Sequence, residues 1–193
     1  SGDNTFDKTI LKLNTAGDSL DIKYFGNNSF KYQSANHGYA KQYGNYLYDV
    51  GATWNFSSNF YSDLLFVKRD LDGDTIWNKT YSIENYEFIQ SLVQTPDNGF
   101  LLGGFTQPFD GTTYGTARWF VIKIDSNGED QWQKKYVNGD LREIIQTKDG
   151  NYVLAGWQET SASLDFCVIK IDSNGDVIWQ KKIGNNQTEA LYG

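Results

Sequence analysis

Short runs of apolar residues alternate with turn residues along most of this chain. The clearest example lies between Leu141 and Ile183, where four such runs predict strands near 142–147, 152–158, 166–172 and 177–183. The turn residues between them include Asp149-Gly150 and Asn174-Gly175, pairs that are typical of tight hairpins between antiparallel strands. No segment sustains the period of apolar residues that a helix requires. The pattern therefore predicts a four-stranded antiparallel meander.

The same order of runs recurs along the chain. Lysines occupy the same place in four copies, at Lys12, Lys68, Lys123 and Lys170, so the period is roughly 50 residues. Four strands repeated at this period are typical of β-propeller blades. We therefore expect an all-β fold, a β-propeller-like array of four-stranded antiparallel blades that need not be complete. One domain would cover 1–193, with blade-like units at about 1–25 (partial), 26–82, 83–136 and 137–184, and a further unit starting at 185–193.

Two residue types indicate how neighbouring units would pack. Glycines stand at matching places in the second strands, at Gly51, Gly104 and Gly156, where small residues would let sheets converge near a central axis. Tryptophans stand at matching places in the fourth strands, at Trp77, Trp132 and Trp179. We expect these large side chains to be mostly buried between sheets and to serve packing.

The number of repeated hairpins bears on closure of a ring. The hairpin of the third and fourth strands of a unit, the outer hairpin, begins near residues 10, 64, 120 and 166. The hairpin of the first and second strands, the inner hairpin, begins only near residues 39, 88 and 142. Residues 188–193 resemble the entry to a further inner strand. Propellers usually contain at least four blades. We therefore expect a fragment of a longer array, or closure through a partner that includes a second copy of this chain.

Composition narrows the possible partners. The chain has 24 acidic and 17 basic residues, a net charge of −7, which argues against nucleic acid because its phosphates require a basic surface. A lone Cys167 in an apolar run is expected to be a buried, inert thiol. No apolar run reaches the roughly 18–20 residues of a membrane span.

Three acidic turns have two interpretations. Asp70–Asp74, Asp125–Glu129 and Asp172–Asp176 place oxygen ligands at alternate positions before or beside a glycine, as calcium loops do. The same residues suit tight hairpin turns, since glycine tolerates positive φ, and the bidentate glutamate of a calcium loop is missing. We favour hairpin turns, and expect neither a metal nor a cofactor.

Catalytic chemistry has few candidates. His37 is the only histidine, which excludes a histidine-based triad or a multi-histidine metal site unless other ligands replace histidine, and its neighbours indicate a solvated loop. Glu143, Glu159 and Asp165 could lie near one blade edge, where two of them would form a carboxylate pair of the kind that glycosidases use. A hydrolase is therefore the third functional hypothesis, and we expect no enzyme.

An aromatic stretch departs most from the repeat. Exposed aromatic rings beside Asn and Ser would form a patch for sugar stacking or protein contact. The alternative is that a divergent blade packs Tyr where its neighbours pack Leu and Val. The candidate binding residues are Tyr39, Tyr43, Tyr46, Tyr48, Trp54, Phe60 and Tyr61, with Phe56 beside them.

The best-preserved motifs are Gln146–Tyr152, Gly156-Trp157 and Asp165–Trp179. They resemble the propeller-like tandem repeats of secreted proteins and lipoproteins of Bacteroidetes. The resemblance implies an exported protein in the periplasm, outer membrane or cell surface. Ser1–Asn4 resembles the tail of a lipobox, so a lipid anchor would be the link to a membrane.

The functional hypothesis that follows is a non-enzymatic binding or scaffolding module whose partner is a protein or a second copy of the chain. A glycan-binding accessory protein of a polysaccharide-capture system is the alternative.

Overall fold

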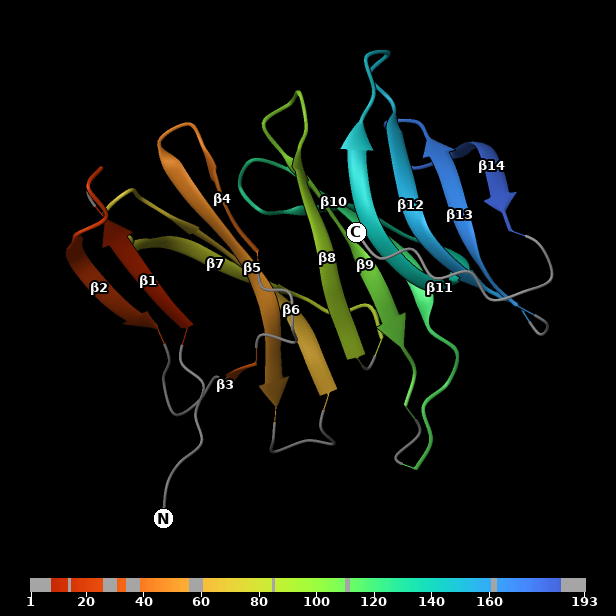
Figure 1. The fold of residues 1–193 in the computed structure, drawn as a ribbon, viewed down its shortest axis with the longest axis horizontal. Coiled ribbons are helices and arrows are strands. Elements are labelled where there is room, and N and C mark those ends of the chain that lie inside the picture. Colours follow the sequence, from red (N-terminus) through yellow and green to blue (C-terminus); the bar gives the residue numbers. More distant parts are fainter. Residues whose placement is uncertain are drawn as a thin grey trace. The chain divides into compact units, whose positions relative to one another are not determined.

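A computed structural model describes residues 8–13, 15–25, 31–33, 39–55, 61–84, 86–109, 112–160 and 163–184. In these residues the regular structure is strand, without a helix, which confirms the all-β prediction (Figure 1). No helix of this described part is long and apolar enough to cross a membrane. The chain divides into two compact units, Ser1–Ser82 and Ile83–Gly193, each described by itself below.

Unit 1 (Ser1–Ser82) combines a separate hairpin with a larger antiparallel sheet. The hairpin consists of β1 (Lys8–Leu13) and β2 (Ser19–Phe25). In the larger sheet β5 (Tyr46–Asn55) pairs with β6 (Tyr61–Arg69), and β6 pairs with β7 (Thr75–Tyr81). The other side of β5 pairs with β4 (Tyr39–Tyr43) and then with β3 (Lys31–Gln33).

Unit 2 (Ile83–Gly193) is an antiparallel ladder in which each strand pairs with the next along the chain. Figure 1 shows its last four strands side by side in this order. The strands are β8 (Tyr86–Gln94), β9 (Phe100–Gln107), β10 (Arg118–Ile124), β11 (Asp130–Gln146), β12 (Tyr152–Glu159), β13 (Leu164–Ile171) and β14 (Val177–Ile183). The strands predicted at 152–158, 166–172 and 177–183 are therefore confirmed.

Strand β11 belongs to two successive meanders. Its residues up to Asn138 pair with β10, and its residues from Gly139 onward pair with β12. The sequence predicted two separate strands here, whereas the structure has one strand of 17 residues. The change of partner occurs at Gly139. Two features require glycine at this position: its φ is +120°, and a Cβ added there would lie only 2.1 Å from the Trp157 carbonyl oxygen. We call β8–β10 with residues 130–138 the first meander, and residues 139–146 with β12–β14 the second meander.

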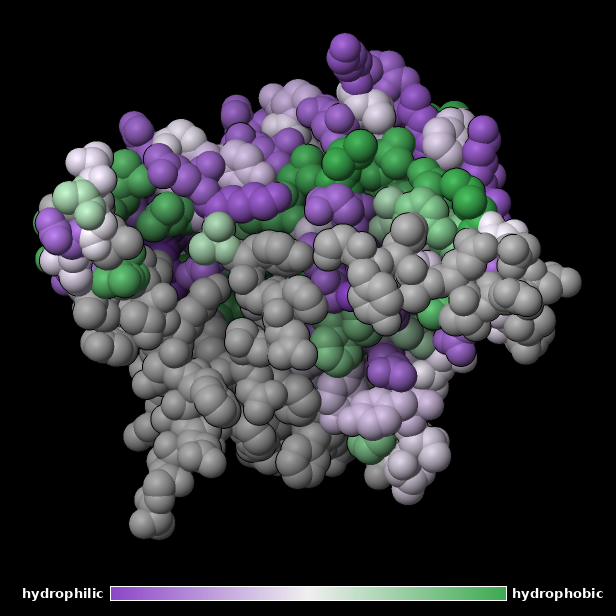
Figure 2. All heavy atoms as spheres, viewed as in Figure 1, coloured by the Kyte–Doolittle hydropathy of each residue, from purple (hydrophilic) through white to green (hydrophobic). Residues whose placement is uncertain are grey.

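The two meanders of unit 2 pack on one another through a shared apolar core. Trp119 is fully buried in this core, and its indole Nε1 donates a hydrogen bond to the Trp157 carbonyl oxygen at 2.8 Å. A Cβ on Gly156 would lie 2.9 Å from Cζ2 of Trp119, so glycine lets the two meanders approach closely at this position. The buried cluster comprises Leu101, Trp119, Val121, Leu141, Ile144, Tyr152, Leu154, Cys167, Ile169 and Ile171. Figure 2 shows hydrophobic residues gathered over the region of β11 and β12, bordered by hydrophilic ones.

The repeated lysines of unit 2 hold the turn between the first two strands of each meander. The ammonium of Lys123 lies 2.8 Å from Asp97 Oδ2, and that of Lys170 lies 2.5 Å from Asp149 Oδ2. The hydroxyls of Thr95 and Thr147 donate to the other oxygens of these carboxylates. The Thr-x-Asp motif and the strand lysine of the repeat are thus parts of one structural contact.

The acidic turns are hairpin turns, as favoured from the sequence. In each one the Oδ1 atom of the first aspartate accepts backbone N–H groups two and four residues later, at 2.8–3.0 Å. The aspartates concerned are Asp70, Asp125 and Asp172. Their side chains therefore serve the local turn.

The fourth-strand tryptophans differ in burial. Trp77 is half-buried, with its ring centroid 5.5 Å from that of Phe66. Trp132 is half-buried against the core of unit 2. Trp179 is 38% exposed, so the prediction that it would be mostly buried is wrong. The reason is its place in β14, the last strand of unit 2 in the described residues: the second meander packs against Trp132, whereas no further meander follows β14 there to pack against Trp179.

Candidate functional site

A cleft of about 460 Å³ opens in unit 2 where the loop after β9 approaches β11 and β12. Polar atoms form most of its lining. The residues around it are Phe105, Gln107, Tyr114, Gly115, Thr116, Ala117, Asp140 and Glu159. They come from the loop after β9, from the ends of β9 and β12, and from the bend in β11, and loops and strand ends are places where a rigid β scaffold usually presents binding groups.

The loop between β9 and β10 has internal structure. Phe109 and Tyr114 form an isolated β-bridge, and the Gly115 N–H donates to the Pro108 carbonyl oxygen at 2.7 Å. The amide of Gln107 donates to the Gly115 carbonyl oxygen at 3.1 Å. These bonds fix the backbone on one side of the cleft.

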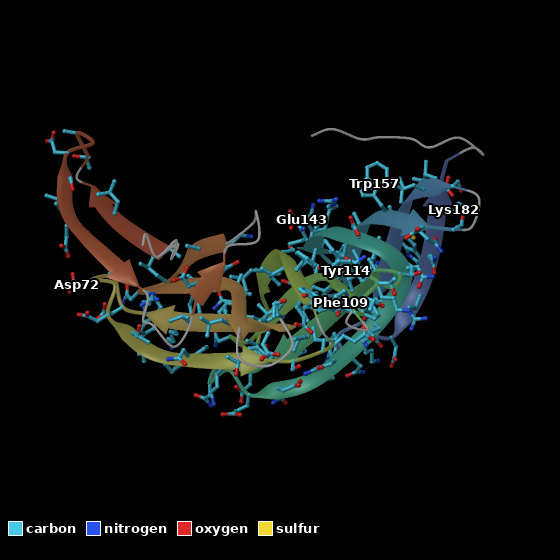
Figure 3. All side chains as sticks on the ribbon, turned by 90° about the horizontal axis from the view of Figure 1, so that it is seen from below. Asp72, Phe109, Tyr114, Glu143, Trp157 and Lys182 are labelled. Atoms are coloured by element: carbon cyan, nitrogen blue, oxygen red, sulfur yellow. The ribbon has the colours of Figure 1, made fainter. Side chains whose placement is uncertain are left out.

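Tyr114 combines a fixed position with an accessible ring. Its ring centroid lies 4.7 Å from that of Phe109 and 5.4 Å from that of Tyr86. Figure 3 shows Phe109 and Tyr114 next to one another. Although these contacts support it, Tyr114 is 58% exposed. An exposed ring held in this way can stack on a sugar face or a cation.

Two carboxylates line the cleft in different surroundings. Asp140 is half-buried directly after the Gly139 bend, and Arg142 Nη2 lies 3.1 Å from its Oδ2. Burial raises the pKa of Asp140 above its ordinary value, and the charge of Glu159 raises it further, while Arg142 opposes the shift. Glu159 is exposed at the end of β12. The pair offers carboxylate oxygens to hydroxyl, amide or ammonium groups of a ligand.

The described residues offer little machinery for covalent or metal chemistry. Among them no group of three His, Cys, Asp or Glu side chains is placed to hold a metal ion. Cys167 is buried, and burial raises the pKa of its thiol. Its thiolate is therefore disfavoured, which makes it unsuited to nucleophilic attack.

The three carboxylates considered for hydrolysis have separate surroundings. Glu143 Oε1 accepts a hydrogen bond from the Ser91 hydroxyl at 2.6 Å. Asp165 is buried, accepts a bond from Ser163 and forms an ion pair with Lys182. Of the three, Glu159 alone lines the cleft, where its acidic neighbour is Asp140. Figure 3 shows Glu143 and Lys182 at separate places in unit 2.

The aromatic stretch lies in unit 1, with its side chains only partly described. Tyr48 is buried and stacks on Phe66 with ring centroids 5.8 Å apart, so its ring belongs to the core of this unit. Tyr43 is half-buried with its ring 6.0 Å from that of Tyr48. Tyr46 is exposed, with the Lys68 ammonium 4.0 Å from its ring centroid.

The other candidates of this stretch fall outside what is described. Tyr39, Trp54 and Tyr61 lie in β4, β5 and β6, but their side chains are not among those described. Phe56, Phe60 and His37 lie outside the described residues altogether.

Sequence reasoning did not single out Tyr114 or Asp140. Both lie where the copies differ: Tyr114 in a loop of varying length, and Asp140 at the change of partner in β11. One sequence feature could have indicated this site: Phe109 and Tyr114 are two aromatic residues in a loop that the repeat pattern does not require to be apolar.

Comparison with known proteins gives limited information. No protein family model matches the chain, and no curated protein matches it. Among solved structures it is similar to the acylaminoacyl peptidase of Pyrococcus horikoshii, with a TM-score of 0.43 and 17% identity over 76% of this chain. The match covers 25% of that structure, so this chain spans about a quarter of its length. A likeness this weak carries no argument about function.

Proposed function

We propose that this chain is a non-enzymatic binding module of propeller-like repeats, and that the cleft beside Tyr114 is its ligand site. The two antiparallel meanders of unit 2 support the repeat architecture, because each has the four strands of a propeller blade and they pack through one core.

The observation that carries the proposal is the combination of groups around the cleft. An exposed ring at Tyr114 stands beside the carboxylates of Asp140 and Glu159 in a space of about 460 Å³. Small-molecule sites are concave spaces of similar size, roughly 300–1,000 Å³, and usually combine an apolar lining with a few placed polar groups, whereas polar atoms form most of this lining. A polar ligand, or a polar side chain of a protein partner, fits this chemistry.

A glycan is the second candidate, favoured by Tyr114 in particular. An aromatic ring beside carboxylates suits a sugar, whose C–H face stacks on the ring while its hydroxyls donate to the acids. This candidate corresponds to an accessory role in polysaccharide capture. The resemblance to exported Bacteroidetes repeat proteins supports a place in the periplasm, outer membrane or cell surface for either function.

The experiment is a binding screen of the full chain on a glycan array and on a peptide array, with affinities then measured by calorimetry. Tyr114→Ala and Asp140→Asn should each weaken the binding of a ligand by about tenfold or more, since each removes a contact worth about 1–2 kcal/mol. Tyr46→Ala is the matched control, because Tyr46 is also exposed but lies in the aromatic stretch of unit 1.

The outcomes separate the hypotheses. Binding that is lost on Tyr46→Ala and kept on Tyr114→Ala would move the site to the aromatic stretch. Turnover of an array glycan that persists through repurification and disappears with Glu159→Gln would show a hydrolase instead of a binding module. The absence of any hit on both arrays would contradict the proposal.

A further inference from the structure

The last strand of unit 2, β14, has an unusually apolar exposed surface. All seven of its residues are exposed, and four of them are the large apolar side chains Val177, Ile178, Trp179 and Ile183. Among the described residues β14 pairs with β13 alone. An edge strand of this composition is a template for association unless something covers it.

The preceding copy in the same chain shows what covers such a strand. Trp132, Lys134 and Tyr136 on β11 stand 47 residues before Trp179, Lys181 and Ile183. The turn between β13 and β14 lies against Trp132, since a Cβ on Gly175 would be 2.8 Å from Cη2 of its ring.

Two polar contacts fix this turn on β11. The Lys134 ammonium lies 2.5 Å from Asp176 Oδ1, and the Tyr136 hydroxyl donates to the Gly175 carbonyl oxygen at 2.9 Å. The fourth strand of the first meander is thus covered by the Gly-Asp turn of the second. By the same geometry, β14 would be covered by the Gly-Asp turn of another repeat.

The β1–β2 hairpin of unit 1 carries a turn of this type. Gly17-Asp18 stands at the position of Gly175-Asp176 in the repeat, and the φ angles of Gly17 and Gly175 are +88° and +79°. No described atom lies within 4 Å of the place where a Cβ on Gly17 would stand. Asp18 is exposed.

One described side chain of this hairpin, that of Leu11, is also exposed where its counterpart in a packed repeat is buried. Leu11 on β1 corresponds to Ile169 on β13, which faces the first meander. Leu11 is 50% exposed, whereas Ile169 is 1% exposed. At Leu11 and Gly17 the hairpin therefore exposes positions that a packed repeat covers.

We propose that the β1–β2 hairpin of one copy of this chain docks on the β14 surface of a second copy. Gly17 covers Trp179, and the Asp18 carboxylate pairs with the Lys181 ammonium. Lys181 already lies with its ammonium 5.7 Å from the Trp179 ring, close to where the acid would arrive. Ile183 replaces Tyr136, so an apolar contact takes the place of one hydrogen bond.

This contact joins two different surfaces, so the association is head to tail. Contacts of this kind close into a ring when the geometry permits and otherwise extend into a filament. Sedimentation equilibrium of the full chain should therefore give a mass that rises with concentration above the 22.0 kDa of one chain.

Charge reversal tests the contact directly. Asp18→Lys alone and Lys181→Asp alone should each abolish association, because each places like charges opposite one another. An equimolar mixture of the two variants should associate again, since each copy then meets its complement. The double variant should also associate by itself. Lys41→Asp is the control, because it makes the same charge change on an exposed residue of β4, which belongs neither to the β1–β2 hairpin nor to β14, and should have no effect.

Circular dichroism and melting temperature establish that each variant is folded. The Trp179→Ala variant tests the same β14 surface without a charge change and should also weaken association. Loss of association in the single variants with recovery on mixing supports the proposal. A monomer at every concentration would overturn it, as would association that survives both single variants. Failure to recover in both the mixture and the double variant would overturn the pairing of Asp18 with Lys181. None of these residues lines the cleft, so the outcome is independent of the proposed binding function.

Discussion

Among single residues, Lys123 and Asp97 explain why the repeat preserves a strand lysine and a turn aspartate together. Lys123 is buried, whereas the side chain of Asp97 is 62% exposed. Burial opposes ionisation of Asp97, but hydrogen bonds from Lys123, Thr95 and Gly99 hold its pKa at about 2, below the ordinary 3.8. The folded state therefore favours the charged carboxylate.

Asp97→Asn should lower the free energy of unfolding at neutral pH by about 1 kcal/mol, a small value because the carboxylate is largely exposed. Because the folded-state pKa is depressed, this contribution is present above about pH 4 and is lost as the pH falls toward 2. Urea denaturation at several pH values checks this, with the exposed Glu129→Gln as control. A difference from wild type that stays constant down to pH 2 would contradict the assignment.

Gly156 and Gly51 stand at the same repeat position, but alanine should have different effects on stability at the two sites. A Cβ on Gly156 would lie 2.2 Å from the Asp140 carbonyl oxygen and 2.9 Å from Trp119, whereas a Cβ on Gly51 would meet no described atom within 4 Å. Gly156→Ala should cost about 1–3 kcal/mol of stability or more, as overpacking does. Gly51→Ala should change stability by less than about 0.5 kcal/mol. Equal effects in thermal denaturation would show that the repeat position, and not the local contact, decides the cost.

At the scale of strands, Trp132 and Trp179 form a natural pair for comparison. They stand at the same repeat position, but Trp132 is packed against the core of unit 2 and Trp179 is exposed. At concentrations where the chain is monomeric, Trp132→Ala should cost about 2–4 kcal/mol and Trp179→Ala less than about 1 kcal/mol. Denaturation curves of the two variants measure this, and a larger cost for Trp179→Ala would contradict the described burial.

The hairpin turns carry a prediction about calcium. Because Oδ1 of Asp70, Asp125 and Asp172 accepts two backbone N–H groups in each turn, these oxygens already stabilise the apo turn. We expect the melting temperature to be the same with calcium and with a chelator. A melting temperature that rises with calcium concentration and falls again on chelation would show a metal site.

Strands were predicted well where their signals are local. Hairpin turns such as Asp172–Asp176 and the alternation in β12 and β13 depend on neighbouring residues, so strands near 152–158, 166–172 and 177–183 followed from the sequence. The continuity of β11 could not be predicted from the sequence, because a glycine at position 139 is equally typical of a turn. The exposure of Trp179 could not be predicted either, since it depends on whether another repeat follows in space.

For the molecule as a whole, the all-β class followed from the repeat, but the cleft did not. Tyr114, Asp140 and Glu159 are far apart in the sequence and meet only because β11 pairs with β12 beside the loop after β9. Repeat patterns describe the residues that pack, whereas ligand sites lie in loops and strand ends that vary between copies.

The most direct test of the proposed function is an NMR titration of the isotope-labelled full chain with a ligand identified on the arrays. The account predicts that the largest amide shift changes fall at residues 114–117, at Asp140 and at Glu159, and that Tyr114→Ala removes them. Shift changes confined to Tyr43, Tyr46 and Tyr48, with residues 114–117 unaffected, would contradict it.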